Sequence, residues 1–211
     1  MNYAAILFDL DGTLVDSIGI YSEAVKDMFA AVGVQLPQEA FRSSYGQGLV
    51  LKDWLAKFNI GEDQMGVLRP LRDQRYIALL REKIEWLDGA SRLLATLKER
   101  HPLGLITGSW QSYVDAIDSR LQVSPHFQTV VTADDIGDFM KPHPHGLLLA
   151  ADRMGVEPEQ CIYIGDQLFD IDAAKSAGMA SCCLRGTYTP KEAVERADFV
   201  VETLEEIEGM V

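Results

Sequence analysis

Residues 4–17 read AAILFDLDGTLVDS, an apolar run that ends at Asp9 and continues into a second aspartate, a glycine and a threonine. So short an apolar run is typical of a strand that is buried on both faces of a parallel sheet. Asp9 and Asp11 are two residues apart, so their side chains point the same way wherever the chain stays extended. Gly12 permits a tight turn or a close backbone approach. The stretch therefore predicts a buried strand that carries two carboxylates at its end.

Similar short runs recur along the chain, and helical patterns lie between most of them. The predicted strands are Ala4–Phe8, Leu103–Ile106, Thr129–Val131, Cys161–Ile164, Ala180–Leu184 and Phe199–Val201. The predicted helices are Ala90–Lys98, Ser109–Leu121 with Ser109 as its N-cap, His145–Met154 closed by Gly155, and Ile171–Ala177 closed by Gly178. Strands that alternate with helices indicate an α/β fold, a Rossmann-like parallel sheet with helices on both faces.

One interval interrupts this alternation. Residues 17–86 contain no convincing strand and show helical periodicity, with breaks expected at Gly33, Pro37, Gly46, Gly61 and Pro70. We therefore expect an α-helical insertion of residues 17–86 in an α/β core that consists of residues 1–16 and 87–211.

Composition limits the partners of the chain. It has 211 residues, 47% of them hydrophobic and 24% charged, which is typical of an ordinary globular protein. With 19 basic and 32 acidic residues the net charge is −13, which disfavours nucleic acid and anionic membranes as partners. Three cysteines, Cys161, Cys182 and Cys183, are unlike a disulfide framework, and no segment has the length of a membrane span. We expect a cytoplasmic protein, either a monomer or a homodimer.

Acidic residues follow two of the predicted strands. Asp9 and Asp11 follow the first strand, and Asp166 and Asp170 follow the strand that begins at Cys161. The carboxyl ends of parallel strands lie at one edge of a sheet, where ligands bind. Three carboxylates at one point, from Asp9, Asp11 and Asp166, need a hard divalent cation to neutralise them. Mg²⁺ suits this set because it accepts carboxylates, waters and phosphate oxygens, and Mn²⁺ accepts the same ligands.

The same edge offers groups that bind an anion. Thr107 and Gly108 follow the second predicted strand and precede a helix, so a hydroxyl and a backbone amide can face a phosphate there. Lys141 precedes another helix, and its ammonium could neutralise a phosphate or keep Asp9 ionised. His143 and His145 flank Pro144, but with no further His or Cys nearby they do not indicate a transition-metal site.

Four motifs in order resemble those of the haloacid dehalogenase (HAD) superfamily. They are Asp9–Ser17, Ile106–Gly108, Lys141–Pro142 and Gly165–Asp170. The helical insertion between the first two is similar to the small cap of the subfamily that includes phosphoglycolate phosphatases, pyrophosphatases and beta-phosphoglucomutases. The resemblance covers essentially the whole chain, with Gln167 and Phe169 as departures where smaller polar residues are more usual.

The resemblance implies a role for each motif residue. Asp9 would be the nucleophile that forms an aspartyl-phosphate, and Asp11 the general acid and base. Mg²⁺ would be held by the carboxylates of Asp9 and Asp166 and the backbone carbonyl of Asp11. Thr107, Gly108 and Lys141 would bind the phosphoryl group, and Asp170 would support the metal or Lys141 from behind.

Within the superfamily the motifs favour a Mg²⁺-dependent phosphatase of a small phosphorylated metabolite. Asp11 disfavours a dehalogenase, because a departing halide needs no proton. Gly165 before Asp166 disfavours a mutase, in which glutamate is typical at that position. A phosphoglycolate-like ester, a sugar phosphate or a nucleotide are the substrates to consider. A phosphomutase and a non-catalytic phospholigand-binding module remain the alternatives.

The insertion offers two groups of polar residues. The segment Arg42–Gly48 is polar and glycine-punctuated, which predicts a loop between helices. This loop is either an ordinary surface turn or a segment whose residues Tyr45 and Gln47 face the substrate. Arg69, Arg72 and Arg75 lie at helical spacing and are interpreted as a solvated basic face.

Overall fold

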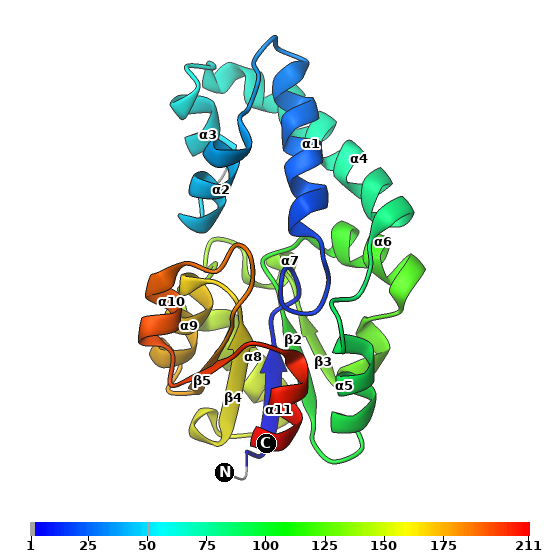
Figure 1. The fold of residues 1–211 in the computed structure, drawn as a ribbon, viewed down its shortest axis with the longest axis vertical. Coiled ribbons are helices and arrows are strands. Elements are labelled where there is room, and N and C mark those ends of the chain that lie inside the picture. Colours follow the sequence, from blue (N-terminus) through cyan, green and yellow to red (C-terminus); the bar gives the residue numbers. More distant parts are fainter. Residues whose placement is uncertain (1–2, 50) are drawn as a thin grey trace.

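The core of the structure, a computed structural model that describes residues 3–49 and 51–211, is a parallel sheet of six strands (Figure 1). The strands are β1 (Ala5–Phe8), β2 (Leu103–Ile106), β3 (Thr129–Val131), β4 (Cys161–Gly165), β5 (Ala180–Leu184) and β6 (Phe199–Val201). Their order is β3-β2-β1-β4-β5-β6. The order reverses between β1 and β4, and this switch point is where open parallel sheets bind ligands.

Helices cover both faces of the sheet. On one face, Ile6 and Phe8 of β1 share a core with α5 (Ala90–Leu97), α6 (Gln111–Leu121) and α11 (Leu204–Met210). On the other face, Ala5 and Leu7 pack with α8 (His145–Met154) and α9 (Leu168–Ser176). The short helices α7 (Ala133–Ile136) and α10 (Lys191–Arg196) complete this layer. Alternate residues of β1 thus enter two cores, as a strand buried on both faces requires.

Four helices separate β1 from α5 and lie beyond the carboxyl ends of the strands (Figure 1). They are α1 (Ile18–Ala30), α2 (Gln38–Gly46), α3 (Leu51–Lys57) and α4 (Met65–Lys83). Their apolar faces share a third core, which includes Phe29, Phe41, Trp54 and Leu68. The expected helical insertion is therefore present, with a hydrophobic cluster of its own.

The predicted α/β fold is confirmed, and most boundaries agree within one residue. Four of the six strands have the predicted limits, whereas β1 begins one residue later and β4 ends one residue later. Helix α9 begins at Leu168, three residues before the predicted start. It starts early because Asp170 and Gln167 form a reciprocal capping box at its first turn.

The structure contradicts the expectations for Pro70 and Arg72 in the helical insertion. Pro70 does not break a helix but lies within α4. The missing hydrogen bond leaves only the Gly66 carbonyl unpaired, and Gly66 is exposed, so water can satisfy it. Arg72 is not on a solvated face either, because its side chain is 8% exposed and contacts Tyr21 of α1 and Tyr113 of α6.

The three cysteines and the lengths of the helices bear on two further expectations. Cys161, Cys182 and Cys183 are buried free thiols. Burial raises the pKa of Cys161 to about 11 and that of the other two to about 12, so all three are uncharged apolar filler at neutral pH. Over the described residues, no helix has both the length and the apolar character that crossing a membrane requires.

Arg72 is expected to fix α4 to the sheet domain. Its guanidinium donates to the hydroxyls of Tyr21 (3.2 Å) and Tyr113 (3.3 Å) and pairs with Asp73. Arg72→Ala leaves these groups without their donor, so it should lower the free energy of unfolding by about 2–4 kcal/mol in urea titrations. Arg69→Ala, at an exposed position of the same helix, is the control and should cost less than about 1 kcal/mol. Equal losses in the two variants would contradict this role for Arg72.

Candidate active site

The turn after β1 places two aspartates at the carboxyl edge of the sheet. The Asp9 amide donates to the Ile164 carbonyl (2.8 Å), which continues the pairing of β1 with β4. The chain then turns, with Gly12 in the left-handed region at a φ of 84°. A Cβ at Gly12 would lie 2.5 Å from Ile18 Cδ1 and 2.9 Å from Asp166 Oδ2. Only glycine therefore fits here, and its backbone closely approaches Asp166.

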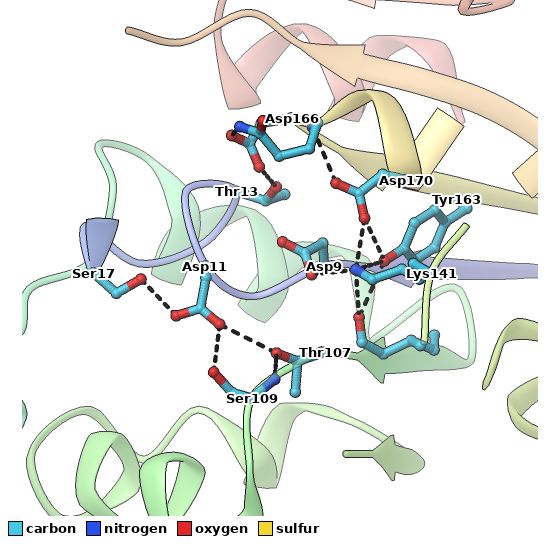
Figure 2. A network of polar contacts seen from close by, with 12 residues as sticks. Asp9, Asp11, Thr13, Ser17, Thr107, Ser109, Lys141, Tyr163, Asp166 and Asp170 are labelled. Carbon is cyan, nitrogen blue, oxygen red and sulfur yellow. Dashed lines mark hydrogen bonds and ion pairs between the residues drawn. The ribbon is translucent and has the colours of Figure 1, made fainter. Parts of the chain in front are cut away.

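Lys141 is the centre of a buried polar network below this turn (Figure 2). Its ammonium donates to Asp9 Oδ1 and Asp170 Oδ1, both at 2.6 Å, and to the Tyr163 hydroxyl at 2.8 Å. The Tyr163 hydroxyl donates in turn to the Ile106 carbonyl (3.0 Å). The side chain of Lys141 is only 4% exposed, so these groups replace its water shell. Residues of β2, β4 and α9 and the residue after β1 thereby hold the Lys141 ammonium beside Asp9.

The charges of this network depend on one another. Burial by itself would lower the pKa of Lys141, but Asp170 and Asp9 outweigh burial and raise it well above its usual range. The pKa of Asp9 is raised, first by burial and then by Asp170, Asp11 and Asp166, although Lys141 opposes the shift. The site thus gathers more negative charge than one lysine balances.

Asp166 faces the same point from the end of β4. Its Oδ1 accepts a hydrogen bond from Thr13 Oγ1 (3.3 Å), and its Oδ2 accepts one from the side-chain amide of Gln167. Burial, followed by repulsion from Asp170, raises the pKa of Asp166 to about 7. Both carboxylate oxygens of Asp170 accept hydrogen bonds from the protein. Its Oδ2 accepts one from the Gln167 backbone amide (3.0 Å), and its Oδ1 accepts one from the Lys141 ammonium.

Asp11 has a separate set of partners (Figure 2). Its Oδ2 accepts the hydroxyls of Ser109 (2.8 Å) and Thr107 (3.2 Å), and its Oδ1 accepts the Ser17 hydroxyl. The Tyr76 hydroxyl lies 3.5 Å from Oδ1. The chain does not stay extended past Asp9, so Asp9 and Asp11 contact different groups. A ring of hydroxyls thus orients Asp11, whereas an ammonium orients Asp9.

The loop after β2 differs from expectation in one respect. Ser109 does not cap α6, because Trp110 occupies the N-cap position and makes no side-chain bond there, while the Ser109 hydroxyl binds Asp11. The Thr107 hydroxyl accepts the Ser109 amide (3.0 Å) and donates to Asp11. Gly108 lies between them at the same edge. The roles of Thr107, Gly108 and Lys141 toward a phosphoryl group stay predictions.

The expected loop Arg42–Gly48 is mostly helix, because α2 continues to Gly46. This prediction from glycine spacing was wrong, since Phe41 and Ser44 are buried and hold α2 against the helical core. Tyr45 is half-buried, and its ring centroid lies 6.4 Å from that of Tyr21 and 6.3 Å from that of Tyr188. Burial, followed by repulsion from Asp166, Asp11 and Asp9, raises the pKa of Tyr45. Gln47 is exposed and its side chain contacts Ser43. The structure thus brings Tyr45, but not Gln47, toward the site.

Sequence reasoning missed several residues of the site. Tyr163 lies within an apolar strand, so nothing in the pattern distinguished it from a core residue. Ser17 and Tyr76 were given no role at the site, although Ser17 lies just before α1 and Tyr76 lies within α4. Spacing could have indicated only Ser17, which ends the first motif.

Three buried carboxylates can meet at one point. Asp9, Asp166 and Asp170 each offer an oxygen, and these atoms lie within 4.8 Å of one another. A parallel sheet carries this acidic centre at its switch point, with a lysine and a hydroxyl-bound aspartate beside it. These features are typical of α/β enzymes that act on an anionic group.

Comparisons with known proteins agree with this class. Residues 6–184 match the family model described as haloacid dehalogenase-like hydrolase. The chain is 31% identical to a phosphoglycolate phosphatase from Shigella boydii, covering 96% of this chain and 90% of that protein, and 33% identical to one from Salmonella choleraesuis, covering 92% and 85%. The crystal structure of CbbY from Rhodobacter sphaeroides in complex with phosphate superposes with a TM-score of 0.82 at 26% identity, covering 97% of this chain and 96% of that one.

The chain therefore belongs to the haloacid dehalogenase-like hydrolases, and the predicted family is confirmed. Within this family it is a phosphatase, as its relatives above 30% identity are.

The Lys141 network predicts a pH-dependent loss of stability in the variant Lys141→Met. The raised pKa of folded Asp9 means that its contribution to stability is present at low pH and is lost as the pH rises. Without the ammonium this loss should grow, to roughly 3–5 kcal/mol at pH 8 and less than half of that at pH 5.5. Urea unfolding in the presence of a chelator measures both values.

Lys175→Met is the matched control, since Lys175 is exposed and pairs with Asp198 at 3.1 Å. It should change stability by less than about 1 kcal/mol at either pH. A loss that is the same at pH 8 and pH 5.5 for Lys141→Met would show that its charge does not stabilise the site.

Proposed function

We propose that the protein is a Mg²⁺-dependent phosphatase that hydrolyses a small phosphorylated metabolite through an aspartyl-phosphate on Asp9. The main support for the proposal is that the two aspartates of one turn have different hydrogen-bond partners. Asp9 is buried beside Lys141, while Asp11 is held apart by the hydroxyls of Ser17, Thr107 and Ser109. This difference in surroundings supports a role for Asp9 in nucleophilic attack and for Asp11 in proton transfer.

In the proposed reaction Asp9 attacks the phosphorus atom and the bond from phosphorus to the ester oxygen breaks. Asp11 gives a proton to the departing alkoxide, which leaves as an alcohol. Asp11 then takes a proton from a water molecule that attacks the phosphorus of the aspartyl-phosphate, and phosphate is released as Asp9 is regenerated. Lys141 and Thr107 neutralise and orient the phosphoryl oxygens, which is the main requirement of phosphoryl transfer.

The chain's own residues fit a magnesium ion. Asp9 and Asp166 are buried oxygen donors with raised pKa values, and one lysine does not balance them. We propose that these two carboxylates and the Asp11 backbone carbonyl hold the ion, with Asp170 behind them. A bound Mg²⁺ would supply positive charge that draws the phosphate to the site and stabilises the transition state. The acidic protein needs such a charge to attract an anionic ester.

We also propose that residues 17–86 form a cap domain over a core of residues 1–16 and 87–211. The two connecting segments pair at this boundary, where the Asp16 amide donates to the Glu85 carbonyl (3.0 Å) and the Leu87 amide to the Leu14 carbonyl (2.9 Å). Gly89, with a φ of 80°, follows directly. The separate hydrophobic cluster of the four helices supports the same division. Such a cap can exclude water from the aspartyl-phosphate and contact the leaving group.

Phosphoglycolate is the first substrate to test, because the curated relatives are phosphoglycolate phosphatases. Sugar phosphates and nucleotides follow. A panel of esters assayed for free phosphate, with Mg²⁺ and with chelator, tests the proposal. A phosphomutase would instead return isomerised ester with little phosphate, and a phospholigand-binding module would return neither.

Substitutions of the two aspartates should reduce phosphatase activity to different extents. Asp9→Asn keeps the shape but removes the nucleophile, so phosphate release should fall to background. Asp11→Asn keeps the nucleophile but loses proton transfer, so kcat should fall by about 100- to 10,000-fold. Steady-state kinetics on the best ester of the panel measure both, and circular dichroism checks the fold. Full activity of Asp9→Asn would overturn the proposed mechanism.

Magnesium should stabilise the protein more at high pH than at low pH. Protons compete for the same carboxylates, since the pKa of folded Asp166 is about 7 and above its unfolded value. At saturating Mg²⁺ we expect the Tm to rise by about 2–4 °C or more at pH 8 and by less at pH 5.5. Asp166→Asn should lose most of the shift at pH 8. A shift of the same size at both pH values would argue against metal binding by these carboxylates.

A further inference from the structure

A series of aromatic rings lies over the carboxylates. The ring centroids of Tyr76 and Tyr21 are 5.1 Å apart, those of Tyr21 and Tyr45 are 6.4 Å apart, and those of Tyr45 and Tyr188 are 6.3 Å apart. We refer to these four tyrosines as the tyrosine roof. Tyr21, Tyr45 and Tyr76 come from the helical insertion, and Tyr188 comes from the loop after β5. The roof therefore joins the two parts of the chain.

Both ends of the tyrosine roof meet the reacting groups. At one end the Tyr76 hydroxyl lies 3.5 Å from Asp11 Oδ1. At the other end the Gln167 side-chain amide donates to the Tyr188 carbonyl (3.4 Å) and to Asp166 Oδ2. Gly48 closes the same side, because a Cβ there would lie 3.6 Å from the ring of Phe169. A group that leaves Asp9 in the direction of Asp11 therefore meets tyrosines.

The roof carries no net charge. The phenol of a tyrosine ordinarily loses its proton only near a pH of about 10. These side chains stay protonated at neutral pH and offer hydroxyl groups and ring faces.

The cations in the neighbourhood are committed to other groups. Lys141 is bonded to Asp9 and Asp170 beneath the site. Arg72 is paired with Asp73. Arg42 is exposed, donates to the Thr187 carbonyl (2.7 Å) and stacks over the outer ring, Tyr188, at 5.3 Å. Of these three cations, Arg42 alone bonds no carboxylate among the described residues, and it lies over Tyr188 at the outer end of the roof. A carboxylate on the leaving group would thus approach several aspartates at the inner end of the roof, at a cost in desolvation and repulsion.

We propose that the substrate is a phosphate ester of an uncharged alcohol that lies against the tyrosine roof, and that a carboxylate-bearing ester such as phosphoglycolate is a poor substrate. This inference rests on the proposed phosphatase activity and narrows its substrate class. Hydroxylated and aromatic alcohols both suit the surface, because ring faces bind their apolar sides and the Tyr45 hydroxyl can bind an oxygen.

A matched pair of esters tests this inference. Phosphoglycolate and 2-hydroxyethyl phosphate have the same two-carbon leaving group, which ends in a carboxylate in one and in a hydroxyl in the other. With Mg²⁺ present we expect kcat/KM for 2-hydroxyethyl phosphate to exceed that for phosphoglycolate by about tenfold or more. Phenyl phosphate is the third substrate and should also exceed phosphoglycolate. A preference of less than threefold, or one for phosphoglycolate, would overturn the inference while leaving the phosphatase intact.

If none of the three esters nor the wider panel releases phosphate, it is the proposed function that fails. The two failures are therefore distinguishable in one experiment.

Adding a cation to the roof should reduce or abolish the preference. In Tyr45→Arg the ratio of the two kcat/KM values should shift by about tenfold toward phosphoglycolate. Val67→Arg adds the same charge at a position of α4 that is 68% exposed, and it should leave the ratio unchanged. Equal shifts in both variants would overturn the role of the roof. Should Tyr45→Arg fail to fold, the ratio measured for the unaltered protein decides the question.

Arg42→Gln addresses the remaining cation. If Arg42 only holds the Tyr188 loop, both esters should lose activity by the same factor. A loss confined to phosphoglycolate would show that Arg42 binds a carboxylate, which contradicts the proposal.

Discussion

The ammonium of Lys141 is the positive charge on which the acidic edge of this protein depends. It lies 2.6 Å from carboxylate oxygens of Asp9 and Asp170 and is almost wholly removed from water. An unpaired buried carboxylate costs several kcal/mol, and three of them meet here. The lysine offsets part of this repulsion, and the remainder is expressed in the raised pKa values of Asp9 and Asp166. This imbalance of charge is the physical basis of the cation site that we propose.

The topology of the sheet explains why these groups meet. Asp9 and Asp166 are far apart in the chain, but β1 and β4 are neighbours in the sheet and run parallel, with Phe8 paired to Ile164. Both strands therefore end at the same level, and each delivers an aspartate just past its last pair. Lys141 reaches the same point from the segment before α8, where Tyr163 of β4 holds its ammonium from below. The register of β1 and β4 and the position of Lys141 thus bring the charged groups together at one point of the sheet edge.

The sequence was sufficient for the sheet and for the charged residues of the site, because both have local signals. Short apolar runs identify strands, and acidic residues directly after them must share an edge. The hydroxyl ring around Asp11 and the position of Arg72 had no such signal. Ser109 fits an N-cap by its sequence position, and only the proximity of Asp11 after folding gives its hydroxyl a different partner. Arg72 looks solvated in a helix taken alone, and it is buried because α4 packs between Tyr21 and Tyr113.

The tyrosine roof shows why substrate selectivity is the least predictable property of such a chain. Tyr21, Tyr45, Tyr76 and Tyr188 come from four separate segments, and each is an ordinary aromatic residue in its own segment. They form one surface only because the insertion lies over the sheet edge and the loop after β5 rises to meet α2 through Arg42 and Thr187. The proposed catalytic aspartates are fixed by strand ends, which tolerate little variation in geometry. The surface that we propose for the leaving group is assembled from helices and a loop, so it can change between relatives of one family while the chemistry beneath it stays the same.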